Sequence, residues 1–323
     1  MLFTLVLCVL IATVCAQFPT LAVPYPVLPL ANVTLPSLTG KLFFVVGCRG
    51  IALQVVLQAS ALGATVACTT RDTDTFNYST IPAAVKVFTL EYGVKNSVQK
   101  LVSKFIKEYG RIPDYVDDVG LTVYNGNQII FTEDELLYQA YMYIIGSLLL
   151  EQGFMAYNNL SVPLVWNYAL STAGKSKIPI FQEFYNVGKT YKISHISGMN
   201  AQKRYPNVRM TGVACVFVNT TISATSYNPS ALAGDIVQQQ FQAVIIAVGG
   251  IIGVPPALVA TAHLQAMLVP DLLGGETIFQ VPQLGGSPNS ASFYMDVFDT
   301  GLQYQNNITL YILETFGLNI TNH

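Results

Sequence analysis

The segment covering residues 42–72 constrains the fold of this chain more than any other stretch. It contains an apolar run at 43–46, a turn with two glycines, a helix-length stretch at 51–62 and a second apolar run at 65–70. Both apolar runs are short and are typical of strands that are buried on both faces. The segment therefore predicts a strand–helix–strand unit, whose first turn offers free backbone N–H groups to a phosphate at the helix N-terminus.

The same alternation of strands and helices continues along the chain. Further strands are expected at 85–90, 115–120, 164–169 and 208–218, and further helices at 97–109, 136–152 and 184–196. Such alternation predicts one mostly parallel sheet covered by helices on both faces. We therefore expect an α/β fold with a Rossmann-type, doubly wound sheet in a single domain.

We place that domain at 41–278, because the flanking segments have a different composition. Residues 17–40 contain five prolines, which predicts an extended arm or linker that lies on the surface and takes no part in the core. Residues 279–323 are mostly polar, with one more apolar helix expected near 310–316, and are expected to form a C-terminal extension.

Charge and composition narrow the classes of function. The chain has 323 residues, with 16 Lys+Arg and 18 Asp+Glu, and its net charge of -2 argues against nucleic-acid binding. Hydrophobic residues make up 52% of the chain, so membrane contact stays open as an alternative. The apolar run at 243–262 is interrupted by Gly-Gly and Pro-Pro pairs, which favours two short helices, or a helix and a loop, over one membrane span. We expect this run to form a lid or a hydrophobic access channel.

The N-terminus predicts entry into the secretory pathway. Residues 1–16 are apolar and end in small residues, which is typical of a cleavable signal peptide, and the run is short for a membrane anchor. Six glycosylation sequons support a secreted or lumenal protein. They begin at Asn32, Asn77, Asn159, Asn219, Asn307 and Asn319.

Three cysteines remain after removal of the leader, namely Cys48, Cys68 and Cys215. The number is odd, and all three lie in or beside expected buried strands, where a free cysteine behaves as a small hydrophobic residue. No disulfide framework is expected. The three histidines, His195, His263 and His323, have no acid or cysteine at a metal-binding spacing, so no metal site is predicted, and His195 is expected to be a packing or surface residue.

The main candidate for chemistry is Tyr185, which is followed four residues later by Lys189 on an expected helix. This spacing puts both side chains on one helix face. An ammonium beside a phenol lowers the phenol pKa from about 10, so that the hydroxyl can exchange a proton with an alcohol or a carbonyl.

With this motif after the fifth strand, residues 41–221 resemble the short-chain dehydrogenase/reductase family. The resemblance implies that Tyr185 is the catalytic acid/base and that Lys189 is its electrostatic partner, which also contacts the cofactor ribose. Ser171 resembles the serine that holds the substrate oxygen. Thr172 stands at the usual spacing and is the alternative, and Ser171 is preferred because Gly174 then falls in the family's position.

The resemblance also implies a nicotinamide dinucleotide. Arg49 and Arg71 stand where members that prefer NADP place basic residues, and a fixed positive fork suits the adenosine 2′-phosphate, so NADP is expected ahead of NAD. Glu91 resembles the acid near the adenine, and Thr220 would meet the nicotinamide carboxamide. The residues expected to bind the cofactor are Gly47, Arg49, Gly50, Ile51, Arg71, Glu91, Gly120 and Thr220.

Several positions depart from the family's pattern. The first turn is one residue shorter than usual, Val46 replaces a threonine, and Ala52 replaces the last glycine, where its methyl group could crowd the pyrophosphate or the helix–strand contact. Tyr143 replaces the catalytic asparagine. The other departures are the sequon at Asn219 and the segments Asp117-Asp118-Val119-Gly120 and Cys215-Val216.

The two acids of that segment would stand near the cofactor at a cost in repulsion and desolvation. Neighbouring strand residues point to opposite faces, so at most one of Asp117 and Asp118 faces the site.

These patterns together predict an NADP(H)-dependent oxidoreductase that interconverts a carbonyl and an alcohol on a small apolar substrate, and the resemblance implies a homo-oligomer. Two alternatives remain at this stage. The first is a secreted, non-catalytic binding or interaction protein on the same fold, which the departures favour. The second is a membrane-anchored scaffold that uses the leader and residues 243–262.

Overall fold

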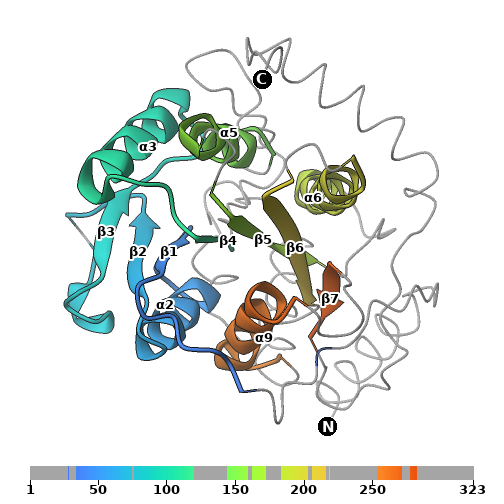
Figure 1. The fold of residues 1–323 in the computed structure, drawn as a ribbon, viewed down its shortest axis with the longest axis horizontal. Coiled ribbons are helices and arrows are strands. Elements are labelled where there is room, and N and C mark those ends of the chain that lie inside the picture. Colours follow the sequence, from blue (N-terminus) through green and yellow to red (C-terminus); the bar gives the residue numbers. More distant parts are fainter. Residues whose placement is uncertain are drawn as a thin grey trace, which may run out of the picture.

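The computed structural model describes residues 28, 34–74, 76–119, 144–158, 162–171, 183–202, 206–215, 218, 253–270 and 277–281. These residues form one seven-stranded sheet with helices on both faces (Figure 1). The predicted α/β class and the doubly wound arrangement are confirmed.

Every strand pair in the sheet is parallel, and the strand order is β3-β2-β1-β4-β5-β6-β7. The strands are β1 Leu42–Val45, β2 Thr65–Thr70, β3 Lys86–Thr89, β4 Tyr115–Asp118, β5 Leu164–Ser171, β6 Val208–Cys215 and β7 Ile278–Gln280. The chain moves from β1 outward to β3 and then returns to the far side of β1 for β4. The ends of β1 and β4 therefore flank the point where the winding reverses, which is where open α/β sheets bind ligands.

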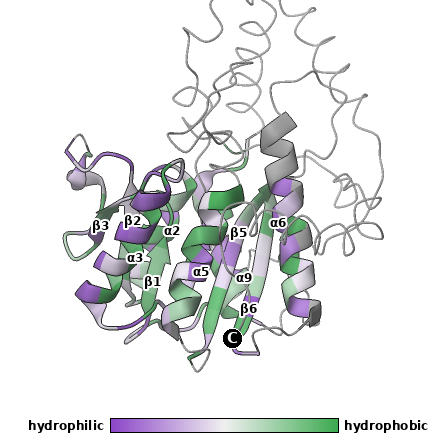
Figure 2. Cartoon of the chain, turned by 90° about the horizontal axis from the view of Figure 1, so that it is seen from above, coloured by the Kyte–Doolittle hydropathy of each residue, from purple (hydrophilic) through white to green (hydrophobic). Residues whose placement is uncertain are grey.

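The helices form two layers. On one face lie α3 Lys95–Tyr109, α5 Gly146–Asn158 and α6 Glu183–Gln202, and on the other lie α2 Ile51–Ala61 and α9 Pro256–Leu268 (Figure 1). A short 3₁₀ helix, η1 Tyr78–Thr80, follows β2. Figure 2 shows hydrophobic residues concentrated on the strands, while hydrophilic residues lie mainly on the outer helices and loops. The expected elements between 43 and 215 agree with these bounds to within a few residues, except that α5 and α6 end six residues later than predicted. The start of the helix predicted at 136–152 lies outside the described residues, which resume at 144, and α5 itself begins at Gly146.

Aromatic side chains fill the core between the sheet and the α3–α5–α6 layer. Phe44 of β1 packs edge-on against Phe105 and Phe154, with ring centroids 5.2 and 5.4 Å apart. Trp166 and Tyr168 of β5 extend this cluster and are almost fully buried. Strand β5 therefore does not need to alternate apolar and polar residues, because both of its faces are covered.

Helix α9 corrects one expectation about residues 243–262. Its side chains Val259, Ala260 and Leu264 are fully buried, and the helix packs against α2, β5 and β6. A helix that is apolar almost all round is stable only when it is buried, so α9 is a core helix and forms neither a lid nor an access channel. Residues 243–252 lie outside the described part of the chain. Within the described part, none of the helices combines the length and the apolar character that crossing a membrane requires.

The N-terminal arm also contributes to the core, contrary to the expectation of a surface arm. Leu38 is 1% exposed and donates its backbone N–H to the Leu62 carbonyl at 2.7 Å. Leu28 is equally buried and packs with Val213 and Phe279. Leu28 stands between Pro26 and Pro29, whose rings already restrict the backbone of the unfolded chain, so this part of the arm adds apolar area to the core at low entropic cost.

Candidate functional site

The predicted site residues gather at one edge of the sheet, because the carboxyl ends of parallel strands meet there. The turn at 47–50 follows β1, Arg71 follows β2, and Glu91 follows β3. Ser171 is the last residue of β5, opposite Cys215 at the end of β6. Gly120, Tyr143, Thr172, Asn219 and Thr220 lie outside the described residues.

The turn between β1 and α2 uses its glycines in conformations that other residues avoid. Gly47 has φ +105° and Gly50 has φ +59°. A Cβ on Gly47 would lie 3.1 Å from the Cβ of Ala52, which is tighter than an ordinary van der Waals contact. The methyl group of Ala52 is thus buried against Gly47 and helps to pack the turn, and whether it crowds a bound pyrophosphate stays a prediction.

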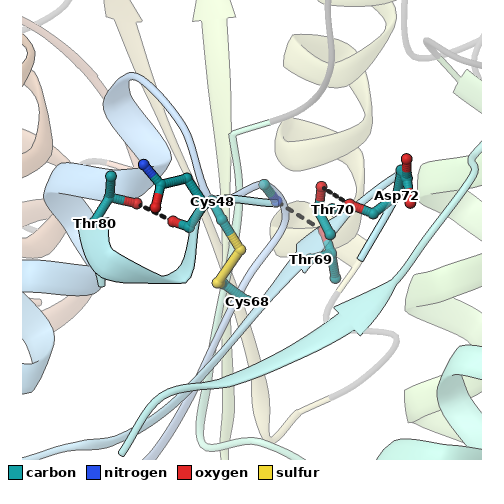
Figure 3. The surroundings of a disulfide bond; sticks show 8 residues. Cys48, Cys68, Thr69, Thr70, Asp72 and Thr80 are labelled. Carbon is teal, nitrogen blue, oxygen red and sulfur yellow. Dashed lines mark hydrogen bonds between the residues drawn. A yellow bond between two sulfur atoms is a disulfide. The ribbon is translucent and has the colours of Figure 1, made fainter. Parts of the chain in front are cut away.

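The same turn contains a disulfide between Cys48 and Cys68, which corrects the expectation of free cysteines (Figure 3). Their Cα atoms are 5.6 Å apart, and both side chains are almost fully buried. The odd cysteine count concealed this pair. The available signal was the position of the two cysteines on neighbouring elements. In the β1–β2 register Cys68 pairs with Val45, and Val45 precedes Cys48 by only three residues.

Two exposed arginines lie near the carboxyl ends of β1 and β2. Arg49 lies within the turn between β1 and α2, and Arg71 directly follows β2. Within the described part of the chain, neither guanidinium forms an ion pair. Glu91 lies at the next strand end, where its carboxylate accepts the backbone N–H of Gly93 at 3.1 Å. The edge near β1 and β2 therefore offers two cations to an anionic group.

Helix α6 carries Tyr185 and Lys189, as predicted. Lys189 is buried, and its Nζ donates to the Ala169 carbonyl at 2.6 Å, two residues before the end of β5. This bond holds the lysine at the carboxyl edge of the sheet. The side chains of Tyr185 and Ser171 lie outside the described part, so their separation stays a prediction.

The two adjacent acids on β4 point to opposite faces, as the strand geometry predicts. Asp118 faces the α5–α6 layer, where its Oδ2 accepts from Ser147 Oγ at 2.6 Å and lies 3.3 Å from Lys192 Nζ. All three side chains are buried. The carboxylate therefore has a positive partner beneath the helices and is not free to repel a cofactor.

Asp117 faces α9 and has a different set of partners. Both of its carboxylate oxygens lie 3.0 Å from His263 Nδ1, and Oδ1 accepts from Asn167 Nδ2 at 2.8 Å. Thr211 continues the network by donating to Asn167 Oδ1 at 2.9 Å. These four side chains are fully buried, so each of the two acids has partners inside the protein that offset part of the expected cost of repulsion and desolvation.

His195 also has an acidic partner, although the sequence pairs neither His195 nor His263 with an acid. Its Nε2 lies 2.9 Å from Glu151 Oε2, which also accepts from the Tyr168 hydroxyl at 2.6 Å. The residues come from α6, α5 and β5, so this cluster joins two helices to the sheet. Among the described residues, no group of three His, Cys, Asp or Glu side chains is arranged to hold a metal ion.

Burial raises the pKa of Tyr92 and of Tyr168 well above the ordinary value of 10.0, and nearby carboxylates raise both further: Asp118 in the case of Tyr92, and chiefly Glu151 in the case of Tyr168. In the unfolded chain these phenols lose their protons near pH 10, whereas in the folded protein they retain them. Their stabilising effect is therefore complete below pH 10 and is lost as the pH rises.

We expect the free energy of unfolding to fall above pH 10 by about 1.4 kcal/mol per pH unit for each of these tyrosines. Tyr92→Phe should remove one such contribution while changing stability at pH 7 by less than about 1 kcal/mol, because the ring and its packing remain. Urea unfolding measured at intervals from pH 7 to 11 would show the change. An alkaline slope equal to that of the wild type would contradict this assignment.

Comparison with known proteins gives a consistent picture of the fold. No protein-family model and no curated protein matches the sequence. Solved structures do match. A short-chain dehydrogenase/reductase from Burkholderia xenovorans is 18% identical with a TM-score of 0.58, over 76% of this chain and 95% of that chain.

Two further matches are reductases. The 3-ketoacyl-(acyl-carrier-protein) reductase from Brucella melitensis, complexed with NADH, is 15% identical with a TM-score of 0.56, over 77% of this chain and 99% of that chain. An NADH-dependent reductase responsible for alginate metabolism is also 15% identical with a TM-score of 0.56, over 76% of this chain and 96% of that chain. With the strand order and the turn described above, these matches show that this chain has the fold of the short-chain dehydrogenases/reductases.

Proposed function

We propose that this protein is an oxidoreductase that interconverts a carbonyl and an alcohol with a nicotinamide dinucleotide, and that it prefers NADP(H). The observation that carries the proposal is the position of Lys189. Its ammonium is bound to the Ala169 carbonyl near the end of β5, at the sheet edge that also holds the glycine turn. The lysine of the Tyr-x-x-x-Lys motif at this edge supports a site that serves both a substrate and a dinucleotide.

The turn supports a dinucleotide on physical grounds. Two glycines with positive φ leave the backbone open to close approach, and the N-terminus of α2 adds free N–H groups and a partial positive charge. Asp117 contacts His263 and Asp118 is paired with Lys192, so both acids that argued against a cofactor have partners inside the protein. The residues present therefore fit the group.

The chemistry follows from three side chains of the chain. When bound, the dinucleotide supplies or accepts the hydride at the substrate carbon. Tyr185 would give its hydroxyl proton to the carbonyl oxygen during reduction and take one back during oxidation. Lys189 would lower the pKa of that phenol, and Ser171 would hold the substrate oxygen by a hydrogen bond.

The preference for NADP rests on Arg49 and Arg71, because an exposed pair of guanidinium groups suits the adenosine 2′-phosphate. Of the similar structures, one is complexed with NADH and another is an NADH-dependent reductase, so the proposed preference for NADP rests on this chain's own residues. The apolar substrate and the homo-oligomer stay predictions, and α9, as a core helix, no longer supports the first. Passage through the secretory pathway is supported by the buried disulfide and by the exposed sequon residue Asn77.

Titration of the leaderless protein with NADPH and NADH tests the cofactor. We expect saturable binding of both, with NADPH tighter. Arg71→Glu should weaken NADPH binding about tenfold or more while changing NADH binding much less, because only NADPH carries the 2′-phosphate. The matched control is Lys104→Glu, which reverses an exposed charge on α3 and should leave both affinities unchanged.

Absence of binding of either dinucleotide at millimolar concentration would overturn the proposal and favour the non-catalytic binding protein. Equal losses for NADPH and NADH in Arg71→Glu would leave an oxidoreductase but remove the NADP preference.

A further inference from the structure

The first turn of α2 is held by few hydrogen bonds within the helix itself. Gly50 caps the helix without any side-chain hydrogen bond. The first two helical hydrogen bonds, from Leu53 N–H to Arg49 and from Gln54 N–H to Gly50, are both long at 3.4 Å. A helix N-terminus without a capping side chain is held weakly. The end of the helix where phosphate would bind is therefore only weakly held by the helix's own hydrogen bonds.

Two cross-links tie this turn to β2 instead. The Gly47 N–H donates to Thr69 Oγ1 at 2.8 Å, and Cys48 is bonded to Cys68 (Figure 3). The anchor is firm, because Cys68 is fully buried and its strand pairs with β1 on one side and β3 on the other. The covalent link thus supplies a constraint that a capping side chain would otherwise provide.

The disulfide also joins the two segments that carry the cations. Arg49 is the residue after Cys48, and Arg71 lies three residues after Cys68. Fixing Cys48 against Cys68 therefore limits how far the two guanidinium groups can separate. Restricting the two chain segments before binding lowers the conformational entropy that is lost when both guanidinium groups bind one phosphate.

We propose that the Cys48–Cys68 disulfide positions the turn for the dinucleotide, so that the oxidised protein is the form that binds NADPH tightly. This inference rests on the proposed function. Both sulfurs are buried, so a reductant reaches them only when the turn opens. NADPH binds the closed turn and lowers the population of the open turn, so it slows a reduction that proceeds through the open form.

The test compares Cys48→Ser/Cys68→Ser with the wild type and with Val98→Ala. Val98 is a fully buried residue of α3, on the opposite face of the sheet from α2, so its truncation lowers stability without removing a link between the turn and β2. We expect the double variant to bind NADPH at least tenfold more weakly, while Val98→Ala stays within threefold of the wild type. Hydrogen exchange without ligand should become faster at residues 47–53 in the double variant and stay unchanged there in Val98→Ala.

A second measurement uses the wild type, so it does not depend on the double variant folding. Dithiothreitol reduces the disulfide to two thiols and becomes a cyclic disulfide itself, a two-electron exchange that alkylation and mass spectrometry follow. Saturating NADPH should slow this reduction at least tenfold, and the reduced protein should bind NADPH about as weakly as the double variant.

The outcomes separate this inference from the proposed function. If the wild type binds NADPH and the double variant or the reduced protein binds it equally well, the inference is overturned and the disulfide only stabilises the fold. If the wild type binds no NADPH, the proposed function falls and the claim about affinity falls with it. In that case, hydrogen exchange decides the remaining claim: faster exchange confined to 47–53 supports the anchoring of the turn, and unchanged exchange overturns it.

Discussion

Lys192→Met should lower the free energy of unfolding by about 3–5 kcal/mol, because it leaves the Asp118 carboxylate buried without its cation. The two side chains are 6% and 0% exposed, and Nζ lies 3.3 Å from Oδ2. Methionine preserves most of the side-chain volume, so the loss reports the missing charge more than a cavity. Urea unfolding followed by the fluorescence of Trp166, which is the sole tryptophan of the sequence and is fully buried, would measure it.

The matched control is Lys86→Met, which removes the same charge from the exposed pair with Glu108. Those side chains are 51% and 43% exposed at a separation of 3.1 Å. A surface pair contributes less than about 1 kcal/mol, so the control should change stability little. Equal effects of the two substitutions would show that water reaches Asp118 in solution and that its pair with Lys192 is not buried.

Tyr185→Phe should lower turnover by about 10²–10⁴-fold, because it removes the hydroxyl that exchanges a proton with the substrate oxygen. The effect should appear in kcat, while the affinity for NADPH stays within a few fold, since the tyrosine acts on the reacting oxygen. The measurement is the oxidation of NADPH with a panel of small aldehydes and ketones that differ in polarity, followed by steady-state kinetics on the best substrate.

Tyr191→Phe provides the control on the same helix. Tyr191 is nearly buried and stacks on His195, with ring centroids 5.9 Å apart, so the same atom is removed from α6 away from the proposed chemistry. Turnover of this variant should stay close to that of the wild type. If Tyr185→Phe retained full turnover, the acid/base role would belong to another group, and the resemblance to the family would end at the fold.

Much of the fold was predictable because its signals are local. Residues 43–46 and 65–70 are apolar over strand length, and the intervening helix ends before Gly63, whose φ of +91° suits a glycine. The opposite orientations of Asp117 and Asp118 followed from strand geometry alone. Strand β7 was not expected, because three residues carry too little periodicity to distinguish a strand from a loop.

The sequence by itself determined the order of strands and helices, the positions of Gly47 and Gly50, and the placement of Tyr185 and Lys189 on one helix. Each of these depends on residues within a few positions of one another, through periodicity, turn geometry or helix spacing.

Only the tertiary structure decided the pairings. His263 meets Asp117 across 146 positions of sequence, His195 meets Glu151 across 44, and Cys48 meets Cys68 across 20. Such partners are chosen by packing between segments, because a buried charge or thiol interacts with whatever the fold brings within a few ångströms, and no local pattern records that choice.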